Sequence, residues 1–377
     1  MNRTIARILT TCGVATSSVS AQTNFPEIEP NETKAQATLV NNMVAGDTIT
    51  GNSTGATAAA GPTSQDTFRV KTGPLPLGIY RHRLTITTTA GLEGHTGTIR
   101  GLSQSGGVPQ SGTDVSLQSS SPFTTPARFN QWYGFGKSEE IYYRVTGSAT
   151  TTADYTATLD SMQVSPTVLG TFQTGSITIT TVGQTGANQT DTDLWVYDSN
   201  LAAIPNFGND DEPFPGTTHG STLTRNFNAG TYYLAISNFN LANNQPAASD
   251  DSFNSGAVTD FANAVVDSSS TGSAAGPLNC SFTITDSSTV AAPVSALKTG
   301  PFDILWFQFS VGTSTGCYAN CDNSTAPPIL NANDFQCFLN AFAVQSDYAN
   351  CDHSTNPPVL NANDFQCFLN AFAVGCT

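Results

Sequence analysis

The sequence predicts a mainly β fold, with one or two antiparallel β-sandwiches followed by a small α-helical module. Short alternations of apolar and polar residues, separated by Gly- and Ser-rich turns, recur through residues 66–311, as is typical of antiparallel sandwiches. A helical spacing of apolar residues is found only in residues 335–372. The length of 377 residues allows two or three domains.

The N-terminal residues 1–21 are expected to form a signal peptide. Arg3 and Arg7 precede a weakly apolar stretch, and small residues lie before a cleavage point at Gln22. The alternative is a lipoprotein signal in which Cys12 is the modified cysteine. No other stretch approaches the ~20 apolar residues that cross a bilayer. We therefore expect a secreted protein, extracellular or at the cell surface, without a transmembrane segment.

The first β-sandwich is expected over residues 22–162. Residues 22 to about 60 are rich in Ala, Thr, Gly and Asn, and we expect them to be partly unstructured. Ordered strands are predicted where apolar side chains alternate with polar ones, at residues 66–71, 80–88, 140–145 and 155–159.

The second β-sandwich is expected over residues 163–312, where the strand pattern is clearer. Turn residues separate five apolar, β-branched or aromatic runs, at residues 175–182, 193–198, 221–227, 231–237 and 304–311. Five short segments, EPNET at 29–33, DTFRV at 66–70, DTDLWVYD at 191–198, NDD at 209–211 and GTYYL at 230–234, resemble the bacterial pre-peptidase C-terminal domain. That resemblance implies a jelly-roll-like sandwich that serves as an accessory module.

The charge distribution argues against a nucleic-acid partner. The formal net charge is −15, and no Lys or Arg follows Lys298, whereas phosphate binding needs clustered cations. Divalent cations are the natural counterions of such a chain. Acidic and amide residues gather at turns of the second sandwich, and they are a candidate second metal site, with solvated turn residues as the alternative: Asp191, Asp193, Asn209, Asp210 and Asp211.

One segment near the C-terminal end occurs twice, at residues 320–344 and 350–374, and residues 330–344 match 360–374 without a difference. In each copy, side chains that carry hard oxygen atoms alternate, and a carboxylate follows at the start of an apolar helix. This order of ligands is that of an EF-hand-like Ca²⁺ loop, although the loop is about three residues longer and contains a Pro-Pro pair. The predicted Ca²⁺ ligands are Asn320, Asp322, Ser324, Asn331 and Asp334 in the first copy and Asn350, Asp352, Ser354, Asn361 and Asp364 in the second.

A structural alternative is that these polar residues only cap the helices, with Asp334 and Asp364 as N-cap residues. The apolar positions Leu330 and Leu360 are expected to pair the two loops as a small sheet. After each loop, phenylalanines recur at helical spacing, so the two short helices can bury their apolar faces against each other.

Six of the eight cysteines lie between residues 317 and 376, which agrees with export to an oxidising compartment. Six cysteines allow fifteen pairings. The repeat makes symmetric pairing the simplest proposal: Cys321 with Cys337, Cys351 with Cys367, and Cys317 with Cys376. Cys280 is expected to be a buried thiol.

Residues 313–377, two tandem loop–helix units that end in Gly375-Cys376, resemble a dockerin of the cysteine-bearing type. The resemblance implies a Ca²⁺-dependent module that binds a cohesin-type domain of another protein or of a cell-surface scaffold. Because the two copies are alike, either helix could present the same face. The partner-binding residues that the resemblance implies are Ala332, Asn333, Gln336 and Asn340, and in the second copy Ala362, Asn363, Gln366 and Asn370.

We expect a protein that is not an enzyme, because no catalytic residues are evident in the sequence. Two alternatives stay open. The chain could be an enzyme or accessory component of extracellular polysaccharide or protein degradation, because dockerin-like modules accompany such enzymes. It could also be a structural surface protein whose disulfide-stapled tail is a cap. A glycan could stack on Trp132-Tyr133 or Tyr232-Tyr233, although core packing explains these aromatic residues better.

Overall fold

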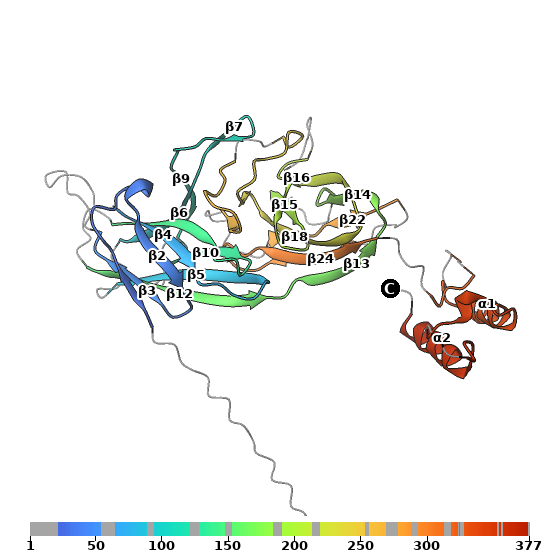
Figure 1. The fold of residues 1–377 in the computed structure, drawn as a ribbon. Helices are drawn as coiled ribbons and strands as arrows, with labels where there is room; N and C mark the ends of the chain where they lie inside the picture. Colours follow the sequence, from blue (N-terminus) through green and yellow to red (C-terminus); the bar gives the residue numbers. More distant parts are fainter. Residues whose placement is uncertain are drawn as a thin grey trace, which may run out of the picture.

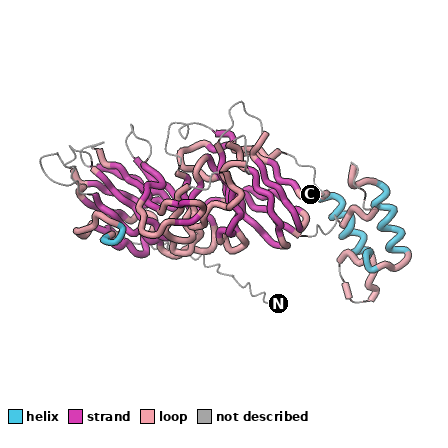
Figure 2. Tube along the Cα trace, turned by 90° about the horizontal axis from the view of Figure 1, so that it is seen from above, coloured by secondary structure: helices cyan, strands magenta, loops and turns pink. Residues whose placement is uncertain are grey.

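The computed structural model describes residues 22–53, 65–88, 94–120, 128–147, 153–183, 191–212, 219–252, 256–268, 278–287, 293–312, 318–322, 324, 328–352, 354–355 and 357–375. The expected signal peptide, Cys12, Cys317 and Cys376 lie outside these residues. Most elements are strands, and the two α-helices of the described part come last in the chain (Figures 1 and 2). The prediction of a mainly β fold with a small helical module is confirmed.

The first sandwich consists of two five-stranded sheets. One has the strand order β1 (Asn24–Pro26), β3 (Thr48–Gly51), β12 (Tyr155–Val164), β5 (Ile79–Thr88) and β10 (Arg128–Gly134). The other has the order β2 (Thr38–Met43), β4 (Gln65–Thr72), β11 (Glu140–Thr146), β6 (Thr96–Gly101) and β9 (Val115–Ser119). Alternate residues of these strands face inward, and Phe68, Leu84, Trp132 and Tyr143 are fully buried between the sheets.

The second sandwich packs a five-stranded sheet against a three-stranded one. The larger sheet has the order β13 (Thr167–Phe172), β24 (Leu305–Val311), β18 (Gly230–Asn238), β15 (Thr192–Tyr197) and β16 (Ala203–Asn209). The smaller has the order β17 (Thr222–Phe227), β14 (Gly175–Thr180) and β22 (Thr283–Thr285). Ile177, Leu194, Leu234 and Phe309 are fully buried between them.

Short elements connect these sheets. They are the 3₁₀ helix η1 (Lys34–Gln36) and the strand pairs β7 (Gln104–Ser105) with β8 (Val108–Pro109), β19 (Leu241–Ala242) with β20 (Val266–Asp267), and β21 (Leu278–Asn279) with β23 (Leu297–Lys298). Each of the nine predicted runs coincides with a described strand. The four strands of the first sandwich extend beyond the predicted runs, whereas β14, β17 and β24 of the second are shorter than predicted.

Three features differ from the prediction. Residues 22 to about 60 were expected to be partly unstructured, but they contain β1, β2 and β3, because Val40, Met43 and Ile49 complete the first core. Three strand pairs are parallel, β1 with β3, β2 with β4 and β13 with β24, in otherwise antiparallel sheets. The boundary expected after residue 162 falls within β12, which continues to Val164.

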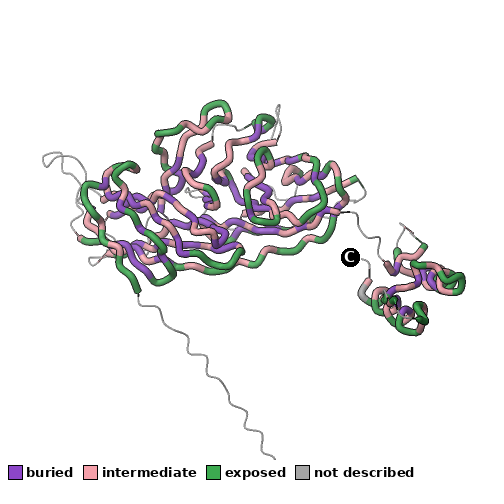
Figure 3. The backbone as a smooth tube through the Cα atoms, viewed as in Figure 1, coloured by how far each residue is buried: buried purple, intermediate pink, exposed green. Residues whose placement is uncertain are grey.

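The two sandwiches share a third apolar cluster. Tyr133 and Phe135 of the first sandwich pack with Trp195 and Trp306 of the second, and Figure 3 shows buried backbone continuing through both. The segment between β19 and β20 crosses onto the first sandwich, where Val258 pairs with Leu102 in an isolated bridge. This shared apolar surface gives the two sandwiches a packed interface.

A buried ion pair fixes the start and the end of that crossing segment. The ammonium group of Lys298 bonds to the carboxylate of Asp267 and to Asn238, and both charged side chains are fully buried. Within the segment, Lys34 forms an ion pair with Asp260 at 2.7 Å. Buried charges of this kind are tolerated because each has an opposite partner.

The helical module has a core of its own. Helices α1 (Ala332–Ala343) and α2 (Ala362–Val374) are joined through the 3₁₀ helix η3 (Asp347–Ala349). The rings of Phe338 and Phe368, both fully buried, stack with their centroids 4.2 Å apart. The expected packing of two phenylalanine-bearing helix faces is therefore present. Among the described residues, no helix is long and apolar enough to span a membrane.

Candidate metal sites

Each helix of the C-terminal module begins with a capping box. The side chain of Asn331 accepts a hydrogen bond from the N–H of Asn333 at 2.8 Å, and the carboxylate of Asp334 accepts one from the N–H of Asn331 at 2.8 Å. Asn361 and Asp364 repeat this arrangement with the same distances. The N-cap residues are thus the asparagines, and the alternative that assigned the N-cap position to the aspartates is wrong, because each aspartate is the third residue of its helix.

The same aspartate also connects the helix to the loop before it. The second oxygen of the Asp334 carboxylate accepts a hydrogen bond from the N–H of Asp322 at 3.2 Å, and Asp334 is fully buried. The Asp322 carboxylate accepts a hydrogen bond from the N–H of Ser324 at 2.9 Å. Asn320 accepts a hydrogen bond from the same N–H at 3.0 Å. Asn320, Asp322, Ser324 and Asp334 therefore form one local network.

The second copy has the same network with one difference. Asp352 donates its N–H to the Asp364 carboxylate at 3.2 Å, and Ser354 donates its N–H to the Asp352 carboxylate at 2.9 Å. The side-chain oxygen of Asn350 is buried and receives no hydrogen bond among the described residues. A buried acceptor without a donor is costly unless a cation or a water molecule meets it.

Electrostatics favours a positive charge between the two acids of each loop. The N–H of Ser324 lowers the pKa of the Asp322 carboxyl, and the Asp334 side chain interacts with it directly. Burial acts to raise the pKa of Asp364, but backbone N–H groups and the Asp352 side chain lower it overall. The two carboxyl groups of each pair are thus held close together, which is a favourable arrangement for a divalent cation.

The donor set fits a hard cation. It consists of carboxylate, amide and hydroxyl oxygens, and the described loop residues offer no sulfur or imidazole ligand. Two expectations are not met. Asn331 and Asn361 serve as N-caps, so their side-chain oxygens are directed at the helices. Leu330 and Leu360 pack on the helical core, and no bridge joins them in the described part.

The residues that the dockerin resemblance assigns to partner binding lie on the surface in both copies. All eight are exposed: Ala332, Asn333, Gln336, Asn340, Ala362, Asn363, Gln366 and Asn370. Gln336 donates a hydrogen bond to Asn340 at 3.0 Å, and Gln366 donates one to Asn370 at the same distance. The two helices therefore present the same polar ridge to solvent.

Two disulfides staple the module as symmetric pairing predicts. Cys321 bonds to Cys337 in α1, and Cys351 bonds to Cys367 in α2. Each bond connects a loop to the helix that follows it. Cys280 is a buried thiol, as expected. The pairing proposed for Cys317 and Cys376 concerns residues outside the described part.

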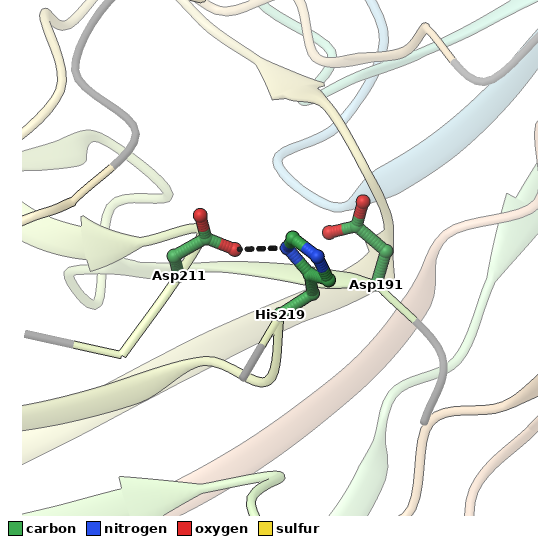
Figure 4. A group of neighbouring side chains, drawn as sticks. All are labelled: Asp191, Asp211 and His219. Atoms are coloured by element: carbon green, nitrogen blue, oxygen red, sulfur yellow. Dashed lines mark ion pairs between the residues drawn. The ribbon is translucent and has the colours of Figure 1, made fainter. Parts of the chain in front are cut away.

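The acidic residues expected to form a second metal site separate into two groups. Asp191 and Asp211 lie on the outer side with His219, and the ligand atoms of these three side chains all lie within 4.8 Å of one another (Figure 4). The imidazole Nδ1 of His219 lies 3.4 Å from an Asp211 carboxylate oxygen, and the His219 side chain is 74% exposed. His219 follows Asp211 by eight residues and lies outside the acidic run, and the sequence analysis did not include it.

The inner group contains Asp193, Asp210 and a third acid, Asp251, that the sequence analysis also missed. All three side chains are buried and line one cavity. Asn209, by contrast, accepts a hydrogen bond from the N–H of Thr222 and thereby holds β17 beside β16. The structure thus adds His219 to the outer group and Asp251 to the inner group, two residues that only tertiary contact brings to the acidic turns.

A third acidic group lies at the N-terminal edge of the first sandwich. The carboxylates of Glu27, Glu29 and Asp66 have ligand atoms within 4.8 Å of one another. Burial raises the pKa of Glu27 to about 7, and the Asp66 charge adds to this shift. Asp66 also accepts a hydrogen bond from the hydroxyl of Tyr155 at 2.7 Å, so the group is held by the core of the sandwich.

One described cavity, in the first sandwich, has a histidine on its wall. It has a volume of about 300 Å³. His82 on its wall bonds through Nδ1 to the hydroxyl of Ser161 at 2.8 Å, and burial lowers the pKa of His82 to about 4. The nearby Glu139 carboxylate lies 3.9 Å from His82 and accepts hydrogen bonds from the N–H groups of Phe135 and Lys137. The Glu139 carboxylate thus stabilises the turn that contains Phe135 and Lys137, and the His82 imidazole is buried in the interior of the sandwich.

The aromatic pairs considered for glycan stacking do not form an open surface. Trp132 and Tyr133 are buried, with 0% and 3% of their surface exposed. Tyr232 is half-buried and stacks on Phe309. The Trp132-Tyr133 alternative is therefore wrong, because both rings are needed to fill cores.

Comparison of the chain with protein-family models and with curated proteins gave no match. The interpretation of the C-terminal module therefore depends on its repeat, its oxygen-rich loops and its exposed helix faces.

Proposed function

We propose that this chain is a secreted, non-catalytic protein whose C-terminal module binds Ca²⁺ and attaches it to a cohesin-type domain of an extracellular or cell-surface scaffold. The observation that carries this proposal is the duplicated helix face. Ala332, Asn333, Gln336 and Asn340 are exposed and are repeated without change in α2. Solvated surface residues have no folding reason to be identical in both copies, whereas a shared binding face requires it.

Calcium would act by ordering these faces. In each loop the ion would be held by the paired carboxylates, Asp322 with Asp334 and Asp352 with Asp364, with amide and hydroxyl oxygens nearby. Because each buried aspartate also caps its helix, an ion that neutralises the paired charges stabilises the start of that helix. A module of about 60 residues has little core, so bound metal and disulfides supply much of its stability.

The β-sandwiches would act as spacer or accessory domains. Their strand segments resemble the pre-peptidase C-terminal domain, and their cores are filled by side chains. A role in extracellular polysaccharide degradation is compatible with this proposal through the scaffold to which such a module attaches.

The test is binding of the full chain to immobilised cohesin-type domains, with calcium and with chelator. Saturable binding in calcium that chelator abolishes supports the proposal. A matched variant, Asp347→Asn, removes an exposed acid from the same module and should bind as the natural chain does. If the oxidised chain binds calcium but none of the domains, the tail is a cap and the docking function is refuted.

A further inference from the structure

Three buried aspartates from distant parts of the chain surround one small cavity between the sandwiches. Asp193 lies on β15, Asp210 follows β16, and Asp251 lies in the segment between β19 and β20. Their exposed fractions are 5%, 3% and 5%. The cavity has a volume of about 20 Å³. That space is enough for one water molecule or one ion.

The carboxylate oxygens of these three aspartates differ in the hydrogen bonds that they accept. Asp193 accepts a hydrogen bond from the N–H of Leu241 at 2.6 Å. Asp251 accepts hydrogen bonds from the N–H groups of Asp210 at 3.1 Å and Asp211 at 3.3 Å. Both carboxylate oxygens of Asp210 are buried without a hydrogen-bond partner among the described residues. An acid that is buried with two orphan oxygens indicates a missing ligand.

The lining of the cavity contains no positive side chain to balance these acids. The described residues around it are acidic, amide-bearing or apolar, and they include Gln104 and Asn243. The buried lysine of the described part, Lys298, is bonded to Asp267. Burial raises the pKa of Asp210 to about 11, and the charges of Asp193 and Asp251 add to that shift. The cluster must therefore take up protons or a cation.

We propose that this cavity binds a divalent cation, with Ca²⁺ as the best match, coordinated by Asp193, Asp210 and Asp251. The lining offers oxygen atoms and neither imidazole nor thiolate, which disfavours zinc and favours a hard cation. These three acids are not among the described triads whose ligand atoms all lie within 4.8 Å of one another. A large ion with a flexible coordination shell, completed by water or amide oxygens, suits that wider spacing better than Mg²⁺ does.

An ion at this position would fasten the two sandwiches together. Asp251 belongs to the segment that crosses to the first sandwich, where Val258 exchanges two backbone hydrogen bonds with Leu102, at 2.8 and 2.9 Å. Gln104 accepts a hydrogen bond from the N–H of Ala247 in the same segment at 3.1 Å. The ion would connect this segment to β15 and to the end of β16. This site is independent of the C-terminal loops and of the docking function.

Terbium luminescence can observe this site separately from the C-terminal loops. Trp195 lines the cavity, and the three tryptophans of the chain, at positions 132, 195 and 306, all precede the helical module. A Tb³⁺ ion in the cavity would receive energy from Trp195 under light that excites tryptophan and not tyrosine. The experiment uses the full chain carrying Asp334→Asn and Asp364→Asn, so that the C-terminal loops are disabled.

In that background we expect tryptophan-sensitised Tb³⁺ emission that excess calcium displaces. Asp210→Asn should reduce the emission at least tenfold. Asp250→Asn removes the neighbouring acid, which forms an ion pair with Arg225 at 2.7 Å and does not line the cavity, and should leave the emission unchanged. Trp195→Phe should lose the emission while calorimetry still detects one calcium ion.

Melting temperatures measured with chelator and with calcium distinguish metal binding by Asp210 from a purely structural role of this residue. Without metal, Asp210 must either take up a proton or bear a buried charge beside two other acids. Asp210→Asn removes that requirement, so the variant should melt at or above the temperature of the parent chain. Calcium should raise the melting temperature of the parent and not that of the variant. If the folded parent shows no sensitised emission, or if Asp210→Asn emits as the parent does, the cluster holds protons only and the proposal is overturned.

Discussion

Replacing the buried aspartate of each C-terminal loop tests how far the helices depend on it. Asp334→Asn keeps the size of the side chain but removes a charge that accepts two backbone hydrogen bonds, at 2.8 and 3.2 Å. Hydrogen bonds to charged groups contribute roughly 1.5–3 kcal/mol each, and the amide retains one acceptor oxygen. We therefore expect a loss of about 2–3 kcal/mol without calcium.

With calcium the difference should grow. A ligand at a concentration of 100 Kd stabilises the folded state by about 2.7 kcal/mol, which the variant loop would not gain. For a domain of this size, that free energy corresponds to a rise of roughly 10–20 °C in melting temperature. Asp364→Asn should behave in the same way, because α2 repeats the contacts of α1.

The assay follows helical circular dichroism of the full chain during heating. The signal reports on the C-terminal module because α1 and α2 are the only α-helices of the described part, while tryptophan fluorescence reports on the sandwiches. Asp347→Asn is the control for the change in net charge. If Asp334→Asn keeps the calcium-induced rise of the natural chain, the loop is not a cation site and the reasoning is refuted.

Three further predictions concern other features. Asn333→Ala or Asn363→Ala alone should weaken docking only about twofold, about 0.4 kcal/mol, because the other helix still binds the partner. The double variant should not bind in the same affinity measurement. Equal large losses from each single variant would refute the hypothesis that either helix can present the binding face. Replacing Cys321 and Cys337 by Ser should lower the stability of the module by about 3 kcal/mol, seen as an earlier helical transition with unchanged tryptophan fluorescence. Burial lowers the pKa of His82 to about 4 in the folded chain, against 6.5 in the unfolded chain, so the unfolded chain binds the proton first. The free energy of unfolding should therefore fall by ~3 kcal/mol as the pH is lowered from about 6.5 to 4. His82→Gln should flatten this pH dependence in denaturation curves, and a parallel fall in both proteins would exclude His82 as its origin.

Much of the β fold could be predicted because strand patterns are local. The alternation in 66–71 or 231–237 repeats every second residue, and each run became a strand. Strands at 38–43 and 48–51 were not predicted, because their polar composition hides inward residues such as Val40 and Ile49. Their burial depends on partners that lie far away in the sequence.

The C-terminal module was the easiest part to predict for the same reason. Its helices and loop-to-helix disulfides all involve neighbours within one copy of the repeat. The assignment of the N-caps was wrong by three residues, because Asn331 and Asp334 are both good capping residues and only the backbone geometry distinguishes them.

The sequence by itself determined the class of the fold, the duplicated loop–helix units and their two symmetric disulfides, because each depends on contacts between residues close in the chain. Only the tertiary structure decided that Asp251 joins Asp193 and Asp210, that His219 joins Asp191 and Asp211, and that the two sandwiches share an apolar core. Such groupings arise when distant strands and loops pack together, and a local residue pattern contains no information about which of them will meet.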